Sequence, residues 1–160
     1  MVKPVDDLLI ETGDVEDAPA LFALQGAAIH GLAARDYSPA QLAAWAPPDR
    51  AGGGFAERLA GTTILVAWRG SALAGFANLT ADGLVDFLFV HPEAAGRGIG
   101  ASLLGAVIDA GRARGLARLA AHVSLTARST FERQGFQVEA AQKVQVRGEV
   151  LTNFRMHLDL

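Results

Sequence analysis

The stretch FVHPEAAGRGIGASLLGAVIDAGRARG, residues 89–115, decides the fold. An apolar run ends at a proline, and a loop that carries Gly96, Gly98 and Gly100 leads into an amphipathic helix. The first-turn amides of such a helix have no intrahelical partners and lie at the positive end of the helix dipole. Because glycine has no Cβ, a large anion can reach these amides, and Arg97 adds a positive charge at the rim. The stretch therefore predicts a phosphate site, and its length suggests a diphosphate.

Length and composition limit the classes of protein that fit. The 160 residues are enough for one domain with a sizeable core, which we expect to span residues 1–160. The chain is 51% hydrophobic and 19% charged, as is typical of a globular protein. Its net charge of −3 does not favour nucleic acid as a partner, because phosphate backbones require concentrated Lys and Arg. The chain has no cysteine, which excludes disulfides, thiolate zinc sites and a cysteine nucleophile.

The N-terminal segment and the hydropathy pattern bear on location. MVKPVDDLLIETGD carries acids where a signal peptide has its apolar core. No segment approaches the roughly 20 apolar residues of a membrane span. We therefore expect a cytoplasmic protein with no membrane partner.

The hydrophobic pattern predicts an α/β fold with a mixed sheet. Parallel pairing is expected around the long helix, because a strand–helix–strand unit needs a crossover. We expect strands at Leu8–Thr12, TTILVAWRG, SALAGFANLTADG, LVDFLFV, LARLAAHVS, FQVEAAQKVQVRG and EVLTNFRMHLDL, and helices from Val15 to about Leu32, after Ser38-Pro39, in FAERLAG, from about Gly98 to Arg114 and from about Thr126 to Gln134.

The glycine loop has other interpretations. It could be a turn that only lets the helix pack on the sheet. Gly96, Gly98 and Ala101 also satisfy the dinucleotide pattern G-x-G-x-x-A, which keeps a nicotinamide-dependent oxidoreductase as an alternative. That match is weak, because residues 91–95 separate the motif from its strand and four strands precede it. A Walker loop is excluded, since no Gly-Lys-Ser/Thr follows.

The segment FLFVHPEAAGRGIGASLL, followed by SLTARSTFERQGF, closely resembles the GCN5-related N-acetyltransferase (GNAT) superfamily. The hallmark of that superfamily is Arg/Gln-x-x-Gly-x-Gly/Ala. Gly98 and Gly100 fill its glycine positions, whereas Ala95 stands where Arg or Gln is usual. The element order from Leu8 to Leu160 also fits, and DYSPAQLAAWAP with the C-terminal segments looks like one bacterial branch of acetyltransferases. The resemblance implies the acyl-CoA N-acyltransferase fold, a mixed central sheet flanked by helices with a V-shaped split between its fourth and fifth strands.

The resemblance also implies acetyl-CoA as the acetyl donor, bound between Leu84–Val90 and Leu116–Val123. The pantetheine would pair with the main chain of the first segment, and the pyrophosphate would bind the loop amides. The amine would attack the thioester directly in a ternary complex, with an amide such as that of Phe89 or Val90 as oxyanion donor. The implied cofactor contacts are Leu88, Phe89, Val90, Ala95, Gly96, Arg97, Gly98, Ile99, Gly100, Ala101, Ser102, Ser124 and Phe131.

The groups that move protons are less defined. Many relatives place a general-acid Tyr where this chain has Phe131, which we expect to pack against the pantetheine. Ser124 stands where Asn is usual, and its hydroxyl could bond the cofactor or a water, or cap local amides. Asp86 lies in an apolar strand, where burial would suit it as a general base, directly or through water. The alternatives are an ion pair between Asp86 and an arginine, and a water chain without a single essential base.

Aromatic residues and histidines complete the set of candidates. His30, Tyr37 and Trp45 could line the acceptor pocket, or could pack at a helix junction. His122 is expected to be a core residue on an interior strand. His157 has no metal-spaced partner, and we expect no metal site.

The acceptor that the resemblance implies is a small-molecule amine, although a protein N-terminus or a lysine stays open. A non-catalytic acyl-CoA-binding sensor is the second interpretation, because the usual Tyr is missing at Phe131. A homodimer that forms through an exposed final strand is a further possibility.

Overall fold

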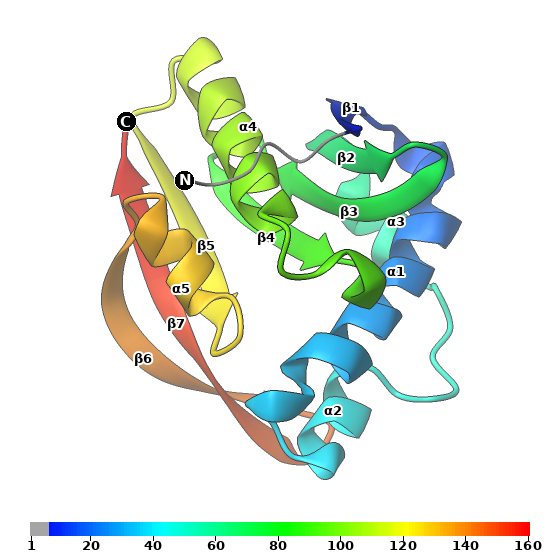
Figure 1. Ribbon diagram of the computed structural model, residues 1–160. Coiled ribbons are helices and arrows are strands. Elements are labelled where there is room, and N and C mark those ends of the chain that lie inside the picture. Colours follow the sequence, from blue (N-terminus) through cyan, green and yellow to red (C-terminus); the bar gives the residue numbers. More distant parts are fainter. Residues whose placement is uncertain (1–6) are drawn as a thin grey trace.

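A computed structural model describes residues 7–160 as one mixed seven-stranded sheet with helices on both faces (Figure 1). Residues 1–6 lie outside the described residues. They include the start of the expected domain and part of the segment that argued against a signal peptide. The strands are β1 (Leu8–Thr12), β2 (Thr63–Arg69), β3 (Ala72–Leu79), β4 (Leu84–Val90), β5 (Arg118–Ser124), β6 (Gln137–Val146) and β7 (Glu149–Asp159). The helices are α1 (Ala18–Leu32), α2 (Pro39–Trp45), α3 (Phe55–Leu59), α4 (Ile99–Ala113) and α5 (Arg128–Arg133). The predicted fold class and element order are confirmed.

Local sequence signals set the ends of several elements. Ser38 and Gln41 form a capping box at the start of α2, with Gln41 N–H donating to Ser38 Oγ at 3.1 Å and Ser38 N–H donating to Gln41 Oε1 at 2.8 Å. Pro39 occupies the first position of that helix, where its missing N–H is not needed. Gly135, with φ of +97°, lies just beyond α5 and allows the chain to turn into β6.

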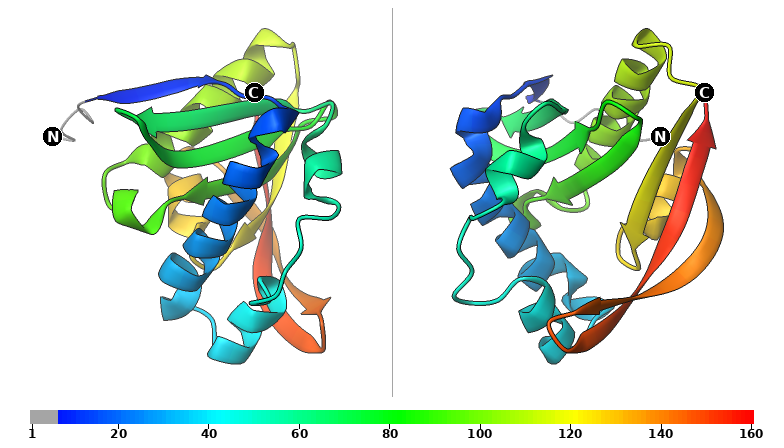
Figure 2. Two further views of the ribbon diagram at one scale, coloured as in Figure 1. Left: turned by 90° about the vertical axis from the view of Figure 1, so that its right-hand side faces the viewer. Right: turned by 180° about the vertical axis from the view of Figure 1, so that it is seen from behind.

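Two hydrophobic cores cover the two faces of strands β1 to β4. The first lies under α4. The helical spacing predicted its buried apolar side chains, and Gly111 is buried as well: the apolar residues are Ile99, Leu103, Leu104, Val107 and Ile108. The second lies under α1 and α3, where Leu21 and Phe55 pack on Val66 and Phe76. Figure 2 shows α4 and α1 on opposite sides of the sheet. Successive residues of β2 alternate between the two cores, as the pleat requires.

The sheet splits between β4 and β5. These two strands are parallel, and they pair only at Leu84 with Ala120 and at Val85 with Ala121. Along the β3–β4 pair, the register shifts so that Asp86 has no partner, which makes it a β-bulge at the point where β4 leaves β5. Because a bulge bends its strand, β4 diverges from β5 beyond this residue (Figure 1).

The side chain of Asn78 forms hydrogen bonds at the bulge, including one to the main chain of β4. Its Oδ1 accepts a hydrogen bond from the Phe87 amide at 2.8 Å, and its Nδ2 donates to Thr62 Oγ1 at 3.3 Å. Asn78 has no exposed surface, so no solvent replaces these bonds. The bend that opens the sheet therefore depends on one buried amide side chain.

The strand order corrects one expectation. β7 lies between β5 and β6, so the final strand is not exposed at an edge as the dimer hypothesis required. The edge strands are β1 and β6. Over residues 7–160, no helix is long and apolar enough to cross a membrane.

Candidate active site

The loop before α4 presents a row of unpaired amides. Gly96 and Gly98 have φ of +75° and +78°, in the left-handed region, and nothing lies within 4 Å of a Cβ built at either position. The amides of residues 96–101 donate to no acceptor in the described part of the chain. The Ser102 amide donates to Gly98 O at 3.0 Å, so the row of unpaired amides ends before this residue. The unpaired row lies at the positive end of a 15-residue helix and suits a diphosphate.

The side chains around this row leave it open. Ala95 and Arg97 are exposed at its rim, whereas Ile99 is buried and anchors the first turn of α4 in the core. A Cβ built on Gly100 would lie 3.6 Å from Val90 Cγ2, an ordinary contact. Arg97 is therefore the only charged side chain among residues 95–100, and it is exposed.

A cavity of about 140 Å³ continues from this loop into the split between β4 and β5. Its walls include Leu88, Phe89 and Val90 from β4, Gly100 from α4, and Ser124 from β5. The structure thus brings together the predicted main-chain segment and the glycine loop. Phe131 does not line this cavity but lines the larger one described next, and it packs edge-on against Phe136 with ring centroids 5.0 Å apart.

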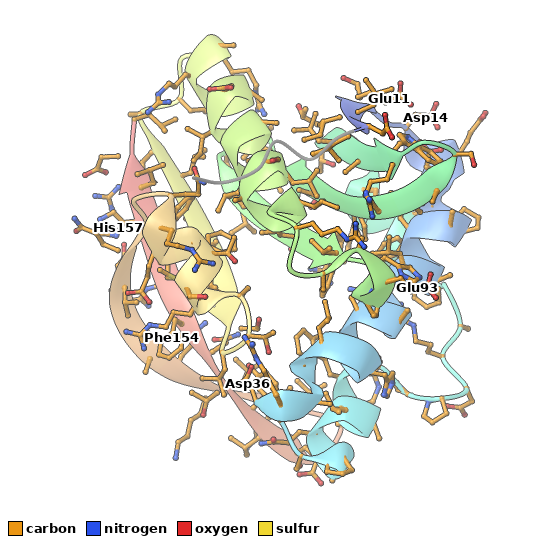
Figure 3. All side chains as sticks on the ribbon, in the orientation of Figure 1. Glu11, Asp14, Asp36, Glu93, Phe154 and His157 are labelled. Carbon is orange, nitrogen blue, oxygen red and sulfur yellow. The ribbon has the colours of Figure 1, made fainter. Side chains whose placement is uncertain are left out.

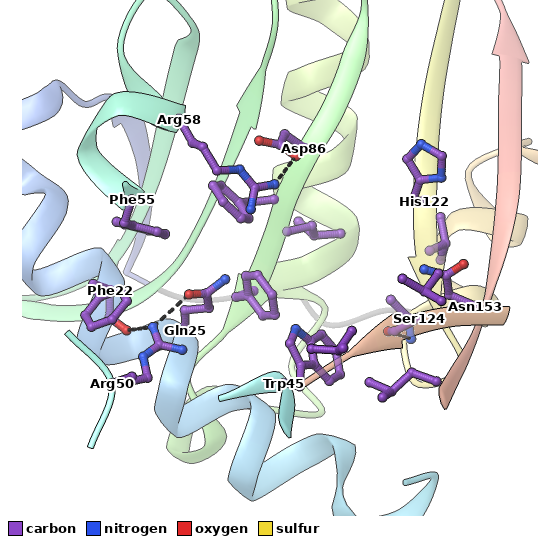
Figure 4. A pocket seen from close by; sticks show the side chains of 18 of the residues that line it. Phe22, Gln25, Trp45, Arg50, Phe55, Arg58, Asp86, His122, Ser124 and Asn153 are labelled. Atoms are coloured by element: carbon purple, nitrogen blue, oxygen red, sulfur yellow. Dashed lines mark hydrogen bonds and ion pairs between the residues drawn. The ribbon is translucent and has the colours of Figure 1, made fainter. Parts of the chain in front are cut away.

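A second cavity of about 560 Å³ opens on the other side of the split (Figure 4). Its walls come from α1, the segment between α2 and α3, β4, β5 and the β6–β7 hairpin. Both cavities are lined by Trp45, Leu88, Phe89, Ser124 and Ala127. The two cavities therefore adjoin each other at the split between β4 and β5.

Asp86 faces the larger cavity as half of an ion pair. Its Oδ1 lies 2.6 Å from an Nη of Arg58 (Figure 4), and 16% of its side chain is exposed. The Arg58 guanidinium also lies 4.4 Å from the centroid of the Phe87 ring. Asp86 is therefore less buried than expected. It forms the ion pair with an arginine that the sequence left open as an alternative.

The end of β5 carries a serine and a histidine on one face. Ser124 Oγ accepts a hydrogen bond from the Ala127 amide at 3.1 Å, which is the local capping alternative. His122 is exposed and lines the larger cavity, with Nδ1 2.8 Å from Gln142 Nε2, so its expected place in the core is wrong. β5 lies inside the sheet, but alternation directs Leu119, Ala121 and Val123 into the core and the intervening residues into the split. The alternation itself was readable in the sequence.

The three predicted acceptor residues have different positions. Trp45 lines both cavities. Tyr37 is buried at the wall of the larger one, where its hydroxyl donates to Thr152 O at 2.7 Å and accepts from the Leu125 amide at 3.0 Å. Burial raises the pKa of Tyr37, which keeps this hydroxyl protonated. His30 is exposed outside both cavities with Nε2 2.7 Å from Ala46 O, which favours the alternative of packing at a helix junction.

Replacing Tyr37 with phenylalanine should lower the free energy of unfolding by about 1 kcal/mol, since the Leu125 amide and the Thr152 carbonyl would lose their partner. Urea denaturation followed by circular dichroism measures this change. An unchanged midpoint would show that the hydroxyl does not fasten the α1–α2 region to the end of β5.

Several cavity residues were not predicted from the sequence. The larger cavity is also lined by Phe22, Gln25, Arg50, Phe55, Arg58, Arg147 and Asn153. They come from segments distant in the chain, and no local pattern links them. His157 lies away from the split (Figure 3), with Nδ1 2.9 Å from Glu139 Oε1. Within the described residues, no group of three or more His, Asp or Glu side chains is arranged to hold a metal ion.

Comparison with known proteins agrees with this geometry. The family model described as an acetyltransferase (GNAT) domain matches residues 33–158. The chain is 34% identical over 146 residues to the N-acetyltransferase YafP of Escherichia coli (strain K12), covering 91% of this chain and 90% of that protein. A GCN5-related N-acetyltransferase from Rhodopseudomonas palustris has a crystal structure that superimposes with a TM-score of 0.88, at 34% identity and 95% coverage of both chains.

A more distant structure shares the fold. The PaiA N-acetyltransferase of Thermoplasma acidophilum, solved in complex with coenzyme A, superimposes with a TM-score of 0.73 at 19% identity, over 96% of this chain and 99% of that one. The split sheet, the open row of amides and these likenesses lead to one conclusion: the chain belongs to the GNAT family of N-acetyltransferases.

Proposed function

We propose that the protein transfers an acetyl group from acetyl-CoA to the primary amine of a small molecule, by direct attack in a ternary complex. The observation that carries this proposal is the pair of cavities that meet where β4 and β5 separate, one of them leading to the unpaired amides of the α4 loop. A donor bound from the loop side and an acceptor bound from the other side would then be within reach of each other.

The residues present fit coenzyme A. The amides from Gly96 to Ala101 would bind the pyrophosphate, with Arg97 at the rim. The main chain of β4 from Leu88 to Val90 has lost β5 as a partner and would pair with the pantetheine as an added strand would. Bound acetyl-CoA supplies an activated thioester, whose C–S bond breaks as the amine nitrogen bonds to the acetyl carbon and whose sulfur leaves as a thiol.

The chain's own residues would orient the amine and manage protons. A β4 amide, of Phe89 or Val90, would donate to the carbonyl oxygen as it gains charge. Asp86 would take the proton that the amine loses, through water that enters the larger cavity. Ser124, at the meeting of the two cavities, would bond a water that protonates the leaving sulfur.

Asp86→Asn should lower kcat by about a hundredfold, because it removes the proposed base, and leave the affinity for CoA unchanged. Steady-state kinetics across pH and calorimetry with CoA measure the two effects. Arg58→Gln is the matched control, since it breaks the same ion pair but keeps the carboxylate and with it the acidic limb of the pH–rate profile. An acidic limb that persists in Asp86→Asn would remove Asp86 from the mechanism.

A second candidate is a sensor that binds acyl-CoA without catalysis. It is favoured by Phe131, because many relatives have a general-acid Tyr at this position. The only tyrosine of the chain, Tyr37, has its hydroxyl committed to two main-chain groups. Labelled acetyl-CoA incubated with an array of primary amines separates the two: the enzyme transfers label to an amine, and the sensor binds the donor without transfer. The nicotinamide alternative gains no support, because antiparallel strands precede the loop.

Location and assembly follow as proposals of the same kind. A cytoplasmic enzyme would have acetyl-CoA available, and a chain without cysteine fits that compartment. A homodimer would pair through β6, the edge strand beside β7.

A further inference from the structure

The larger cavity carries positive charge that the protein does not neutralise. Among the residues that line it are Arg50, Arg58 and Arg147, and one carboxylate, Asp86. Asp86 is already held by Arg58 at 2.6 Å. Neither Arg50 nor Arg147 forms an ion pair with any acidic side chain in residues 7–160. The cavity therefore holds two cations without a counterion.

Neutral groups fix Arg50 in place. One Nη donates to Phe22 O at 2.9 Å and to Gln25 Oε1 at 2.8 Å, and the guanidinium carbon lies 3.6 Å from the centroid of the Phe22 ring. Burial lowers the pKa of Arg50, and the nearby charge of Arg147 lowers it further. An anion bound between the two side chains would oppose both effects.

Arg147 occupies a turn position that does not favour arginine. It and Gly148 form the two-residue β6–β7 turn with φ of +44° and +83°, and such turns favour Asn, Asp or Gly at the first position. Its Nη1 donates to Ala44 O at 2.7 Å, which directs the guanidinium toward α2 and the cavity. A residue in an unfavourable conformation beside a cavity is a candidate for a functional role.

On the opposite side of the cavity, the side-chain oxygen of Asn153 has no hydrogen-bond donor within the described residues. Asn153 Oδ1 is buried and has no partner in the part of the chain that the structure describes. In the β5–β7 pair Asn153 is opposite Ser124, which lines both cavities. Figure 4 shows Asn153 beside Ser124, across the cavity from Arg50. This oxygen has no accessible surface, so an amine beside the split would bond it only after the Asn153 amide turns its oxygen toward the cavity.

Aromatic rings form a large part of the cavity wall. Phe22, Trp45, Phe55, Phe87 and Phe89 all line it, so it offers apolar surface as well as the two arginines. Its volume of about 560 Å³ lies in the range of small-molecule sites, about 300–1,000 Å³.

We infer that the acceptor is a small amino acid-like molecule with an apolar or aromatic body. Its carboxylate binds between Arg50 and Arg147, and its primary amine lies beside Asn153 and Ser124 at the split. The inference rests on the proposed acetyl transfer and names its substrate class.

The test uses matched pairs of amines. Aromatic α-amino acids and aromatic ω-amino acids of increasing length are each compared with their own carboxamide, which keeps shape and amine but lacks the charge. With acetyl-CoA saturating, we expect the best acid to have a kcat/KM at least tenfold above its amide, because a charge-assisted hydrogen bond is lost with the carboxylate. Calorimetry of the same pairs with the CoA-bound protein should show the same order of affinity without any turnover.

Two variants assign the preference to the arginines. Arg147→Asn suits the turn, so it should keep the melting temperature while reducing the preference for acid over amide at least fivefold. Arg50→Gln should also reduce the preference at least fivefold, with some loss of melting temperature because its bonds to Phe22 O and Gln25 Oε1 are lost, and Arg50→Lys should retain part of the preference. Arg112→Gln, which removes one exposed charge at the far end of α4, is the control and should change nothing. Asn153→Leu should raise KM for acid and amide alike.

The outcomes separate this inference from the proposed function. If no amine is acetylated and CoA does not bind, the proposed function fails. If amides are acetylated as well as acids, the inference is wrong and the acetyltransferase stands. If Arg50→Gln or Arg147→Asn weakens CoA binding instead of acid preference, the two arginines belong to the donor side and the inference is also wrong.

Discussion

Gly98→Glu should abolish the binding of coenzyme A. The residue begins α4 with φ of +78°, and a glutamate there would set its carboxylate against the unpaired amides of residues 96–101. A negative charge on the amides would repel the diphosphate that they are proposed to bind. Calorimetry should show no heat of binding at a CoA concentration that saturates the wild-type protein.

Gly115→Glu is the matched control for this variant. Gly115 has φ of +72°, is exposed, and lies beyond the other end of the same helix with open space around a Cβ. Both substitutions therefore carry the same backbone strain and add the same charge, and only Gly98→Glu places that charge on the amides. Equal CoA affinity in the two variants would refute the loop as the pyrophosphate site.

Asn78→Leu should lower the free energy of unfolding by about 3 kcal/mol. The Phe87 amide would stay buried at the β4 bulge without an acceptor, and an unpaired buried group costs about 1–3 kcal/mol; the full burial of this site supports the upper end. Guanidinium denaturation measures the loss. CoA affinity should fall as well, because the bend in β4 opens the split.

Asn153→Leu gives the comparison for Asn78→Leu, since it makes the same change at the other asparagine of the chain. Asn153 Oδ1 has no partner within residues 7–160, so its removal should leave the free energy of unfolding within about 0.5 kcal/mol of the wild-type value. Equal losses in the two variants would mean that the bond to the Phe87 amide has no special weight.

The sequence predicted those parts of the fold that rest on local pattern. The apolar spacing from Ile99 to Ile108 identified the face of α4 that packs on the sheet, and Ser38 with Pro39 marked the start of α2. The row of amides in the glycine loop was also accessible from the sequence, because it depends only on a helix start and missing side chains.

Features that depend on contacts between distant segments were not predicted. The bulge at Asp86 involves the Asn78 side chain from another strand, and the arginine that pairs with Asp86 could not be identified because Arg58 comes from α3. The hairpin of β6 and β7 was visible, but the sequence did not show which of its strands pairs with β5. His122 was misplaced because an interior strand can still border a split.

The two cavities have walls of different origin, and this has a consequence for how the protein can change. The smaller cavity, the proposed donor side, has most of its walls in helices and strands, among them α1, β4 and the start of α4. Arg50 and Arg147 lie instead in a connecting segment and in a hairpin turn, where substitutions disturb few neighbours. If these arginines select the acceptor as proposed, mutation at their peripheral positions would redirect the enzyme to new amines while the acetyl donor stays the same, and the two specificities would be separable in evolution and in engineering.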